Sequence, residues 1–359
     1  MSAAAVVLTL WLVPVSAYAV APEDVIDTSP LVEELPDEAW DYMPEISPLS
    51  GDMEKALGKI LENARDKLAE ETASVVRTGG ILLIISVIVS LADALDTGGK
   101  APRYILLCGV AATASASFSD FDSFLLRGET ALFQLSEYSK VVMPMLATVS
   151  AAAGAPGSAA ARYAAATVFM DFLLSLTRTV IFPGICAYAA AAAADAAVGN
   201  HVLRTAKKLI FRGITMLLAG ISLAFTTWVS LSGVTAESAD AVTVRMTRSA
   251  LTAALPVVGK ILSDAAGALV SAAGVLRSSI GFFGMTAVLC ICAGPFISLG
   301  VRYVVYKLAA VVCQCVSDPA ISALVEDVGS CFAMMLGAIG TGALMVFVSV
   351  FSMIRMVIP

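Results

Sequence analysis

The stretch GGILLIISVIVSLADAL, residues 79–95, decides the fold class of this chain. It carries a single charged side chain, Asp93. Such a run is typical of a helix that crosses a lipid bilayer, because apolar side chains suit the hydrocarbon core. The rest of the 359-residue chain agrees, since 58% of its residues are hydrophobic and 14% are charged, against about 25% charged in soluble proteins. The sequence therefore predicts an all-α, polytopic helical membrane protein.

The formal charge is distributed unevenly along the chain. Residues 20–78 hold 15 acidic and 5 basic residues, whereas residues 79–359 hold 14 acidic and 17 basic residues. The net acidity thus belongs to one polar segment near the N-terminus. Because no basic patch interleaved with aromatic residues is present, we expect no nucleic acid among the partners.

The residues before the first span predict an exported N-terminus. Residues 1–19 contain an apolar core and end in Ala17-Tyr18-Ala19, a small-x-small site typical of a secretory signal peptide. A short first membrane helix is the alternative. Residues 20–50 are acidic and proline-rich and predict an extended extracytoplasmic linker. Residues 51–78 place apolar side chains at helical spacing, which predicts an amphipathic helix lying on the membrane, on a partner or on the protein's own membrane domain.

Residues 79–359 predict a multi-span membrane domain. Several of its apolar segments are broken by proline or rich in alanine and glycine, and small residues let membrane helices approach closely. Residues 104–118 are short and contain three hydroxyl side chains, so whether they cross is left open. The other apolar segments are 79–95, 141–155, 164–182, 184–198, 209–232, 254–274, 280–294, 296–316 and 331–354.

Two parts of the membrane domain resemble each other. MLLAGISLAFTTWVSL (216–231) aligns with MLGAIGTGALMVFVSV (335–350), with six of sixteen positions identical. Alanine-rich sequences also align by chance. The interpretation therefore depends on several matches that occur in the same order in both parts. It favours an internal duplication with repeat units 141–232 and 253–351. Each unit also contains two prolines separated by 39 positions, namely Pro144 and Pro183 in one unit and Pro256 and Pro295 in the other.

Loop charges predict that the two units lie in opposite orientations. The linker before the last helix of the first unit is basic, and the matching linker of the second unit is acidic. Since basic loops stay in the cytoplasm, the units would form an inverted repeat, as in many transporters. This account gives about seven spans, with residues 20–78 outside and Lys207 and Arg355 inside. The linker residues are Arg204, Lys207, Lys208 and Arg212 in the first unit, and Asp318, Glu326 and Asp327 in the second.

Charges and prolines inside apolar sequence are the first candidates for a pathway or an interface. A charge in the bilayer costs about 2.5–3.5 kcal/mol on insertion scales, so it usually pairs or faces water. Asp171 and Arg178 are seven residues apart and would share a helix face, as a polar pathway or as a structural pair. Pro295 interrupts an apolar span, either to line a cavity or as a packing kink.

The segment 254–267 is the second candidate. Pro256 removes a backbone hydrogen bond, and Gly259 leaves room for a close neighbour. Lys260 and Asp264 are four residues apart, so they can pair on one helix face. Such a pair is costly against lipid and tolerable in a wet cavity or at a protein contact. The alternative is an interfacial helix whose charges meet lipid headgroups.

The sequence lacks a recognisable catalytic or metal-binding motif. His201 is the single histidine, which argues against a histidine-based zinc site or a Ser-His triad. All seven cysteines lie in apolar sequence, and two residues of a helix separated by one position point to different faces. The spacing of Cys290 and Cys292, and of Cys313 and Cys315, therefore suits small buried side chains. We expect no enzyme activity, no cofactor and no metal.

Three stretches of the sequence resemble the stage III sporulation protein AE family of endospore-forming bacteria. They are ALPVVGKILSDAAGALVSAAGVLRSSIG (254–281), VRYVVYKLAAVVCQCVSD (301–318) and LRTAKKLI (203–210). The layout is similar too, with an exported N-terminus, a polar segment and a multi-span domain. The similarity covers residues 79–355, and 254–281 is its most specific part.

The resemblance implies a role in spore development. Family members sit in the mother-cell membrane surrounding the forespore, in a secretion-like channel complex between the two cells. The implied partners are other proteins of the same sporulation operon, including a cytoplasmic ATPase and ring-forming membrane proteins. We expect either a permease-like core that passes solutes, or a non-conducting membrane scaffold that anchors the channel ring and its ATPase. The family has no agreed catalytic residues, so none is transferred.

Overall fold

The computed structural model describes residues 29–43, 53–95, 102–119, 121–254 and 258–355. The predicted signal peptide and Pro256 lie outside these residues. Every regular element within them is a helix, which confirms the all-α fold class. The elements are α2 (Ser29–Glu33), α3 (Asp37–Trp40), α4 (Met53–Leu95), α5 (Pro102–Phe118), α6 (Phe121–Ala152), α7 (Pro156–Leu176), the π-helical segment η2 (Thr177–Ile181), α8 (Phe182–Val198), α9 (His201–Ala254), α10 (Val258–Val316) and α11 (Pro319–Ile354).

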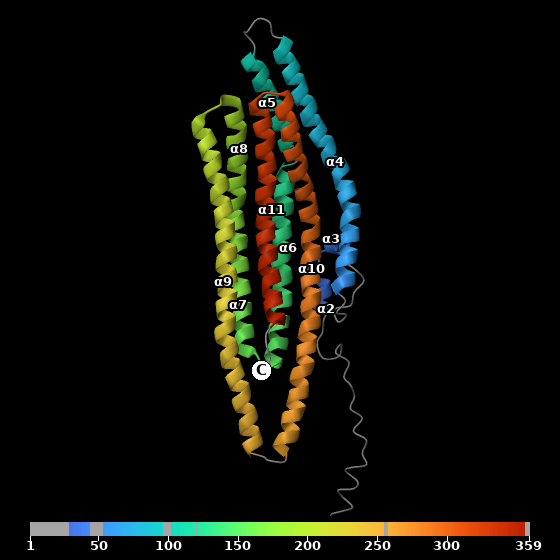
Figure 1. Ribbon diagram of the computed structural model, residues 1–359, viewed down its shortest axis with the longest axis vertical. Coiled ribbons are helices and arrows are strands. Elements are labelled where there is room, and N and C mark those ends of the chain that lie inside the picture. Colours follow the sequence, from blue (N-terminus) through green and yellow to red (C-terminus); the bar gives the residue numbers. More distant parts are fainter. Residues whose placement is uncertain (1–28, 44–52, 96–101, 120, 255–257, 356–359) are drawn as a thin grey trace, which may run out of the picture.

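The long helices lie side by side and alternate in direction (Figure 1). Among the described residues, six helical segments are long and apolar enough to cross a membrane. All backbone polar groups in such segments can pair within their own helix, which a bilayer requires. This is the architecture of a multi-pass membrane protein. The six segments are Gly58–Leu95, Arg103–Ala152, Pro156–Val198, His201–Leu231, Val270–Val316 and Pro319–Ile354.

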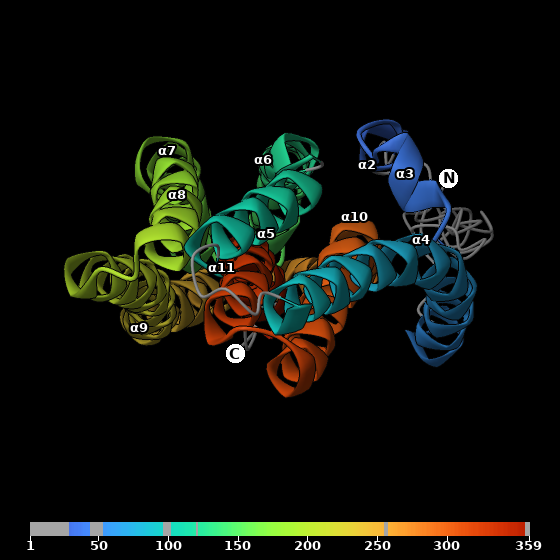
Figure 2. The ribbon, with the colours of Figure 1, turned by 90° about the horizontal axis from the view of Figure 1, so that it is seen from above.

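Helix α11 occupies the centre of the bundle. Seen from above, it is surrounded by α6, α7, α8, α9 and α10, whereas α4 lies at the periphery (Figure 2). Helices α9 and α10 are 54 and 59 residues long, and their lower parts extend beyond the other helices (Figure 1). The core therefore forms around the upper parts of these two helices and around α11.

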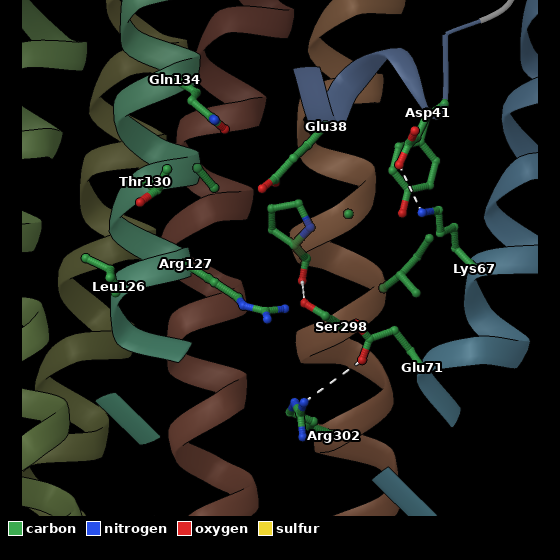
Figure 3. Close-up of a pocket in the computed structure, with 15 residues that line it drawn as sticks. Glu38, Asp41, Lys67, Glu71, Leu126, Arg127, Thr130, Gln134, Ser298 and Arg302 are labelled. Atoms are coloured by element: carbon green, nitrogen blue, oxygen red, sulfur yellow. Dashed lines mark hydrogen bonds and ion pairs between the residues drawn. The ribbon is translucent and has the colours of Figure 1, made fainter. Parts of the chain in front are cut away.

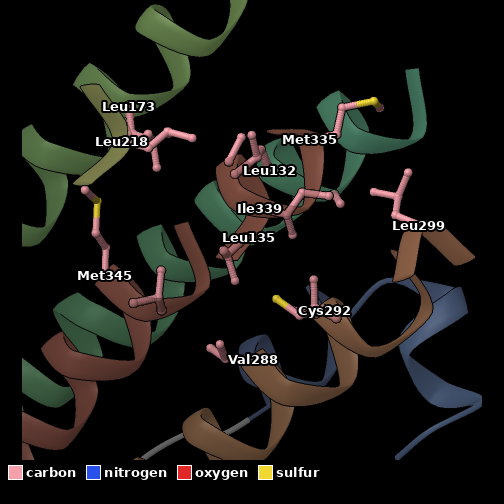
Figure 4. Close-up of a cluster of buried hydrophobic side chains, with 14 of the residues drawn as sticks. Leu132, Leu135, Leu173, Leu218, Val288, Cys292, Leu299, Met335, Ile339 and Met345 are labelled. Atoms are coloured by element: carbon pink, nitrogen blue, oxygen red, sulfur yellow. The ribbon is translucent and has the colours of Figure 1, made fainter. Parts of the chain in front are cut away.

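The core is apolar and depends on close helix approach. Leucines of α6, α7 and α9 meet methionine and isoleucine side chains of α11 and the inner face of α10 (Figure 4). Gly342 of α11 permits this contact, because a Cβ atom there would lie 2.7 Å from Leu132 and 3.3 Å from Leu135. Small residues at helix contacts are a general device of membrane bundles.

The span boundaries differ from those expected, because two prolines do not end their helices. The segments 164–182 and 184–198 belong to one continuous helical run, in which the π-helical turn η2 precedes Pro183. Pro295 lies inside α10, which also joins the three segments expected between 254 and 316. Proline removes one backbone donor and kinks a helix, but the chain continues in the same direction when the neighbouring turns adjust.

The arrangement of the proposed repeats differs from the inverted one. Unit 141–232 contains the end of α6, the α7–α8 run and the first part of α9, whereas unit 253–351 contains α10 and most of α11. The matched helices α9 and α11 run in the same direction in Figure 1, as do α7–α8 and α10, so the expected inversion is wrong. Helix α4 begins and α11 ends toward the same end of the bundle, which also disagrees with seven spans. The duplication itself stays a prediction from the sequence.

Candidate functional site

A polar cavity of about 620 Å³ lies where α3, α4, α6 and α10 meet. Figure 3 shows its charged side chains converging from all four helices. Among its lining residues are three acids and three bases, so the formal charges of the two sets balance. They are Glu38, Asp41 and Glu71, and Lys67, Arg127 and Arg302.

Two ion pairs lie at the α4 side of the cavity. Lys67 Nζ lies 2.9 Å from Asp41 Oδ2, and Arg302 Nη2 lies 3.9 Å from Glu71 Oε2. The guanidinium carbon of Arg302 also lies 3.7 Å from the centre of the Phe124 ring. Because Arg302 is 8% exposed, this cation–π contact forms in a largely desolvated place. The paired side chains connect the polar N-terminal half of α4 to the interior of the bundle.

Two charged side chains point into the open part of the cavity. Glu38 projects from α3 and Arg127 from α6, with Thr130 and Gln134 beside them (Figure 3). The Arg127 guanidinium carbon lies 5.6 Å from the Phe124 ring centre, farther than that of Arg302. A cavity with facing positive and negative groups can solvate a polar or zwitterionic molecule better than an apolar one.

Pro295, a residue singled out from the sequence, forms part of the α10 wall of this cavity. A proline supplies no backbone donor, so the carbonyl one turn earlier has no helical partner. The Ser298 hydroxyl donates a hydrogen bond to the Pro295 carbonyl oxygen at 3.4 Å. Polar groups of α10 therefore line the cavity at the proline, although the rest of this helix is mostly apolar.

The acidic N-terminal segment covers the outer side of the cavity. Its short helices α2 and α3 contact α6 and α10, respectively, and the side chains of Leu31, Leu35 and Ala39 in this segment are buried. Tyr42 lines the cavity, and burial raises the pKa of its hydroxyl above the ordinary value, so it stays protonated at neutral pH. Asn63 Nδ2 donates to the Asp41 carbonyl oxygen at 3.1 Å and holds this segment to α4.

The other sequence candidates lie elsewhere. Arg178 Nε forms an ion pair with Glu129 Oε1 of α6 at 2.6 Å, and Asp171 is exposed on α7. The turn η2 begins at Thr177, and its wider winding changes the face on which Arg178 lies. Neither residue lines the cavity.

The candidates in segment 254–267 are placed only in part. Gly259, Lys260 and Asp264 fall in the first turns of α10, while their side chains, like Pro256, lie outside what the structure describes. Their proposed role as a functional surface therefore stays a prediction.

Sequence reasoning missed the residues that line most of the cavity. Glu38, Lys67 and Glu71 lie in polar sequence, where a charge carries no special signal. Arg127 precedes the segment that was expected to span. Within the described residues, no three cysteine, histidine, aspartate or glutamate side chains converge to hold a metal ion.

Comparison with known proteins identifies the family. The family model described as stage III sporulation protein AE matches residues 40–356, which include all long helices and every residue that lines the cavity except Glu38. The stage III sporulation protein AE of Bacillus subtilis (strain 168) is 22% identical over 219 residues, which cover 61% of this chain and 55% of that protein. The matched region thus spans little more than half of the curated relative's length. No solved structure matches the chain. Because the family model covers most of the sequence, the chain belongs to the stage III sporulation protein AE family.

Proposed function

We propose that this chain is a membrane component of the channel complex between mother cell and forespore, and that it forms a permease-like core required for late spore development. Family membership supports a role in stage III of sporulation. The polar cavity beside Pro295 is the observation that carries the permease reading.

The cavity favours a permease over a simple scaffold for an energetic reason. A scaffold needs only helices that pack, and apolar side chains do this without cost. Buried charges such as Arg302 cost several kcal/mol by order of magnitude unless they are paired. Six charged side chains line this cavity. Their cost in stability is explained if polar solutes enter the cavity, whereas a scaffold would not need them.

The position of the N-terminal segment suggests how access is controlled. Glu38 and Asp41 belong to a short segment that is separate in sequence from the long helices. It is held by apolar contacts of α2 and α3 and by the Lys67–Asp41 ion pair. Movement of so small a unit would open the cavity without repacking the bundle. We propose that this segment acts as its cover on the extracytoplasmic side.

Filling the cavity without changing its charge separates the two functions. Thr130 lines the cavity and is exposed within it, so Thr130→Trp should occupy the space next to Arg127 and Gln134. Thr215 is an exposed threonine of α9 outside the cavity, and Thr215→Trp is the matched control.

A permease predicts that Thr130→Trp lowers the yield of heat-resistant spores at least about tenfold, while Thr215→Trp sporulates normally; both proteins should reach normal membrane levels. Normal sporulation of Thr130→Trp would contradict a conducting cavity and favour the scaffold. Co-purification of the variants with the operon's ATPase and ring-forming proteins tests the proposed partners, because a scaffold defect would reduce it.

A further inference from the structure

A second charged cluster lies between α8, α9 and α11, away from the polar cavity. Lys207 Nζ of α9 lies 2.9 Å from Asp195 Oδ2 of α8 and 2.5 Å from Asp327 Oδ2 of α11. The hydroxyl of Tyr188 donates to Asp327 Oδ1 at 2.7 Å. The side chains of Lys207, Asp195 and Asp327 are only 10%, 6% and 15% exposed. One ammonium group thus bridges carboxylates of two other helices.

The buried groups of the cluster are short of positive charge. Two carboxylates and one ammonium carry a net charge of −1 when all are ionised. Arg204 approaches Asp195 Oδ2 at 3.6 Å, but its side chain is 56% exposed and its charge is screened by solvent. A buried charge that is not compensated is strongly unfavourable, so one more positive charge would stabilise the cluster.

Asp195 has an oxygen atom available for that charge. Its Oδ1 atom is inaccessible to solvent and accepts no hydrogen bond among the described residues. An ionised carboxylate oxygen can only accept, and a buried acceptor without a donor is unfavourable. Protonation of this side chain removes the excess negative charge.

A water-sized path reaches the cluster. A cavity of about 460 Å³ is lined by Asp195, Lys207 and Asp327. It extends to Gly199, in the turn between α8 and α9, and to Pro319, at the start of α11. Both turns lie at one end of the bundle, so the cluster is connected to the surface there (Figure 1).

We propose that Asp195, Lys207 and Asp327 form a proton-binding site that joins α8, α9 and α11. A hydronium ion that enters the cavity from the surface transfers its proton and leaves as water, one carboxylate changes from −1 to 0, and Lys207 keeps its charge. Lys207 then retains one anionic partner instead of two, and the connection from α9 to α8 or α11 weakens. The groups facing the carboxylates are Arg204 and Lys207 from α9, Tyr188 from α8, and Asp318 and Cys331 from α11.

Infrared difference spectroscopy on the full-length protein in lipid nanodiscs tests the proposal, because it detects a carboxyl group gaining its proton. The wild type should show a protonated-carboxyl band whose intensity changes when the pH is varied between 4.5 and 9. Asp195→Asn or Asp327→Asn should remove this band. The control Asp171→Asn changes an exposed aspartate of α7 and should keep it. Spectra of both cluster variants identical to wild type would overturn the site.

Lys207→Met tests the proton-binding site independently, even if one of the aspartate variants does not fold. Without the ammonium between them, the two carboxylates repel each other, so the proton should bind at least about tenfold more tightly, equal to one pKa unit. An unchanged midpoint would contradict the proposal. Because the measurement reports proton binding and not transport, its outcome is independent of whether the polar cavity conducts.

Discussion

Replacing Arg302 by methionine tests whether the polar cavity holds α4 to the membrane domain. The methionine keeps much of the apolar stem and removes the charge. In the native protein, the guanidinium group lies 3.7 Å from the Phe124 ring centre and 3.9 Å from the Glu71 carboxylate. Both interactions join a residue of α10 to a different helix, α6 or α4.

The expected loss follows from the burial of each partner. A desolvated cation–π contact contributes about 2 kcal/mol. Glu71 is 30% exposed and its pair with Arg302 is long, so we assign this ion pair no more than about 1 kcal/mol. Arg302→Met should therefore lower the free energy of unfolding by about 2–3 kcal/mol. Arg302→Lys should lose about half of this, because lysine keeps the charge but lacks the planar group.

Equilibrium unfolding in mixed micelles measures this difference. Arg127→Met is the matched control, since the Arg127 guanidinium lies 5.6 Å from the same ring and its side chain is exposed. Exposed cation–π contacts contribute about 0.5–1 kcal/mol, so this control should stay close to wild type. Equal destabilisation by both methionine variants would refute the reasoning, because burial and distance would then not determine the strength of the contact.

Two further predictions concern packing and topology. Gly342→Ala places a methyl group 2.7 Å from the buried Leu132, so it should destabilise the protein by about 1 kcal/mol. At Gly220 a methyl group would meet nothing within 4 Å, so Gly220→Ala should stabilise the protein by about 0.5–1 kcal/mol. Thermal unfolding in detergent measures both changes, and two changes of the same sign would contradict this prediction. With six crossings and the basic linker in the cytoplasm, a cysteine at exposed Lys208 should resist an impermeant maleimide in intact cells, and one at Arg355 should react above the background of native thiols. Labelling at position 208 and protection at 355 would show the opposite orientation.

Composition and local pattern were sufficient for the fold class and the family. The low charge after residue 78 and the run 79–95 predict membrane helices, because the bilayer restricts which side chains can be used. The resemblance of 254–281 to the sporulation family was confirmed by a match over residues 40–356. Both patterns lie in short continuous stretches of the chain, so a single sequence is sufficient to detect them.

Helix ends and ion pairs between distant residues could not be predicted from the sequence in this way. Pro183 and Pro295 were interpreted as boundaries, yet a π-turn and an adjustment of the helix backbone keep the chain straight enough to continue. Arg178 pairs with Glu129, 49 positions away, and Lys207 with Asp327, 120 positions away. Such pairs depend on how helices pack, and a single sequence carries no direct record of that packing.

The lengths of α9 and α10 have a mechanical consequence. Helix α9 continues for 23 residues from the end of its apolar segment at Leu231 to Ala254, which corresponds to about 35 Å at 1.5 Å per residue. Helix α10 runs beside it, and together they project past the rest of the bundle on the side where α4 begins. A lever of this length converts a tilt of about 10° within the bundle into a displacement of about 6 Å at its tip. A small rearrangement around α11 would thus displace any protein bound to the tip, well outside the bilayer.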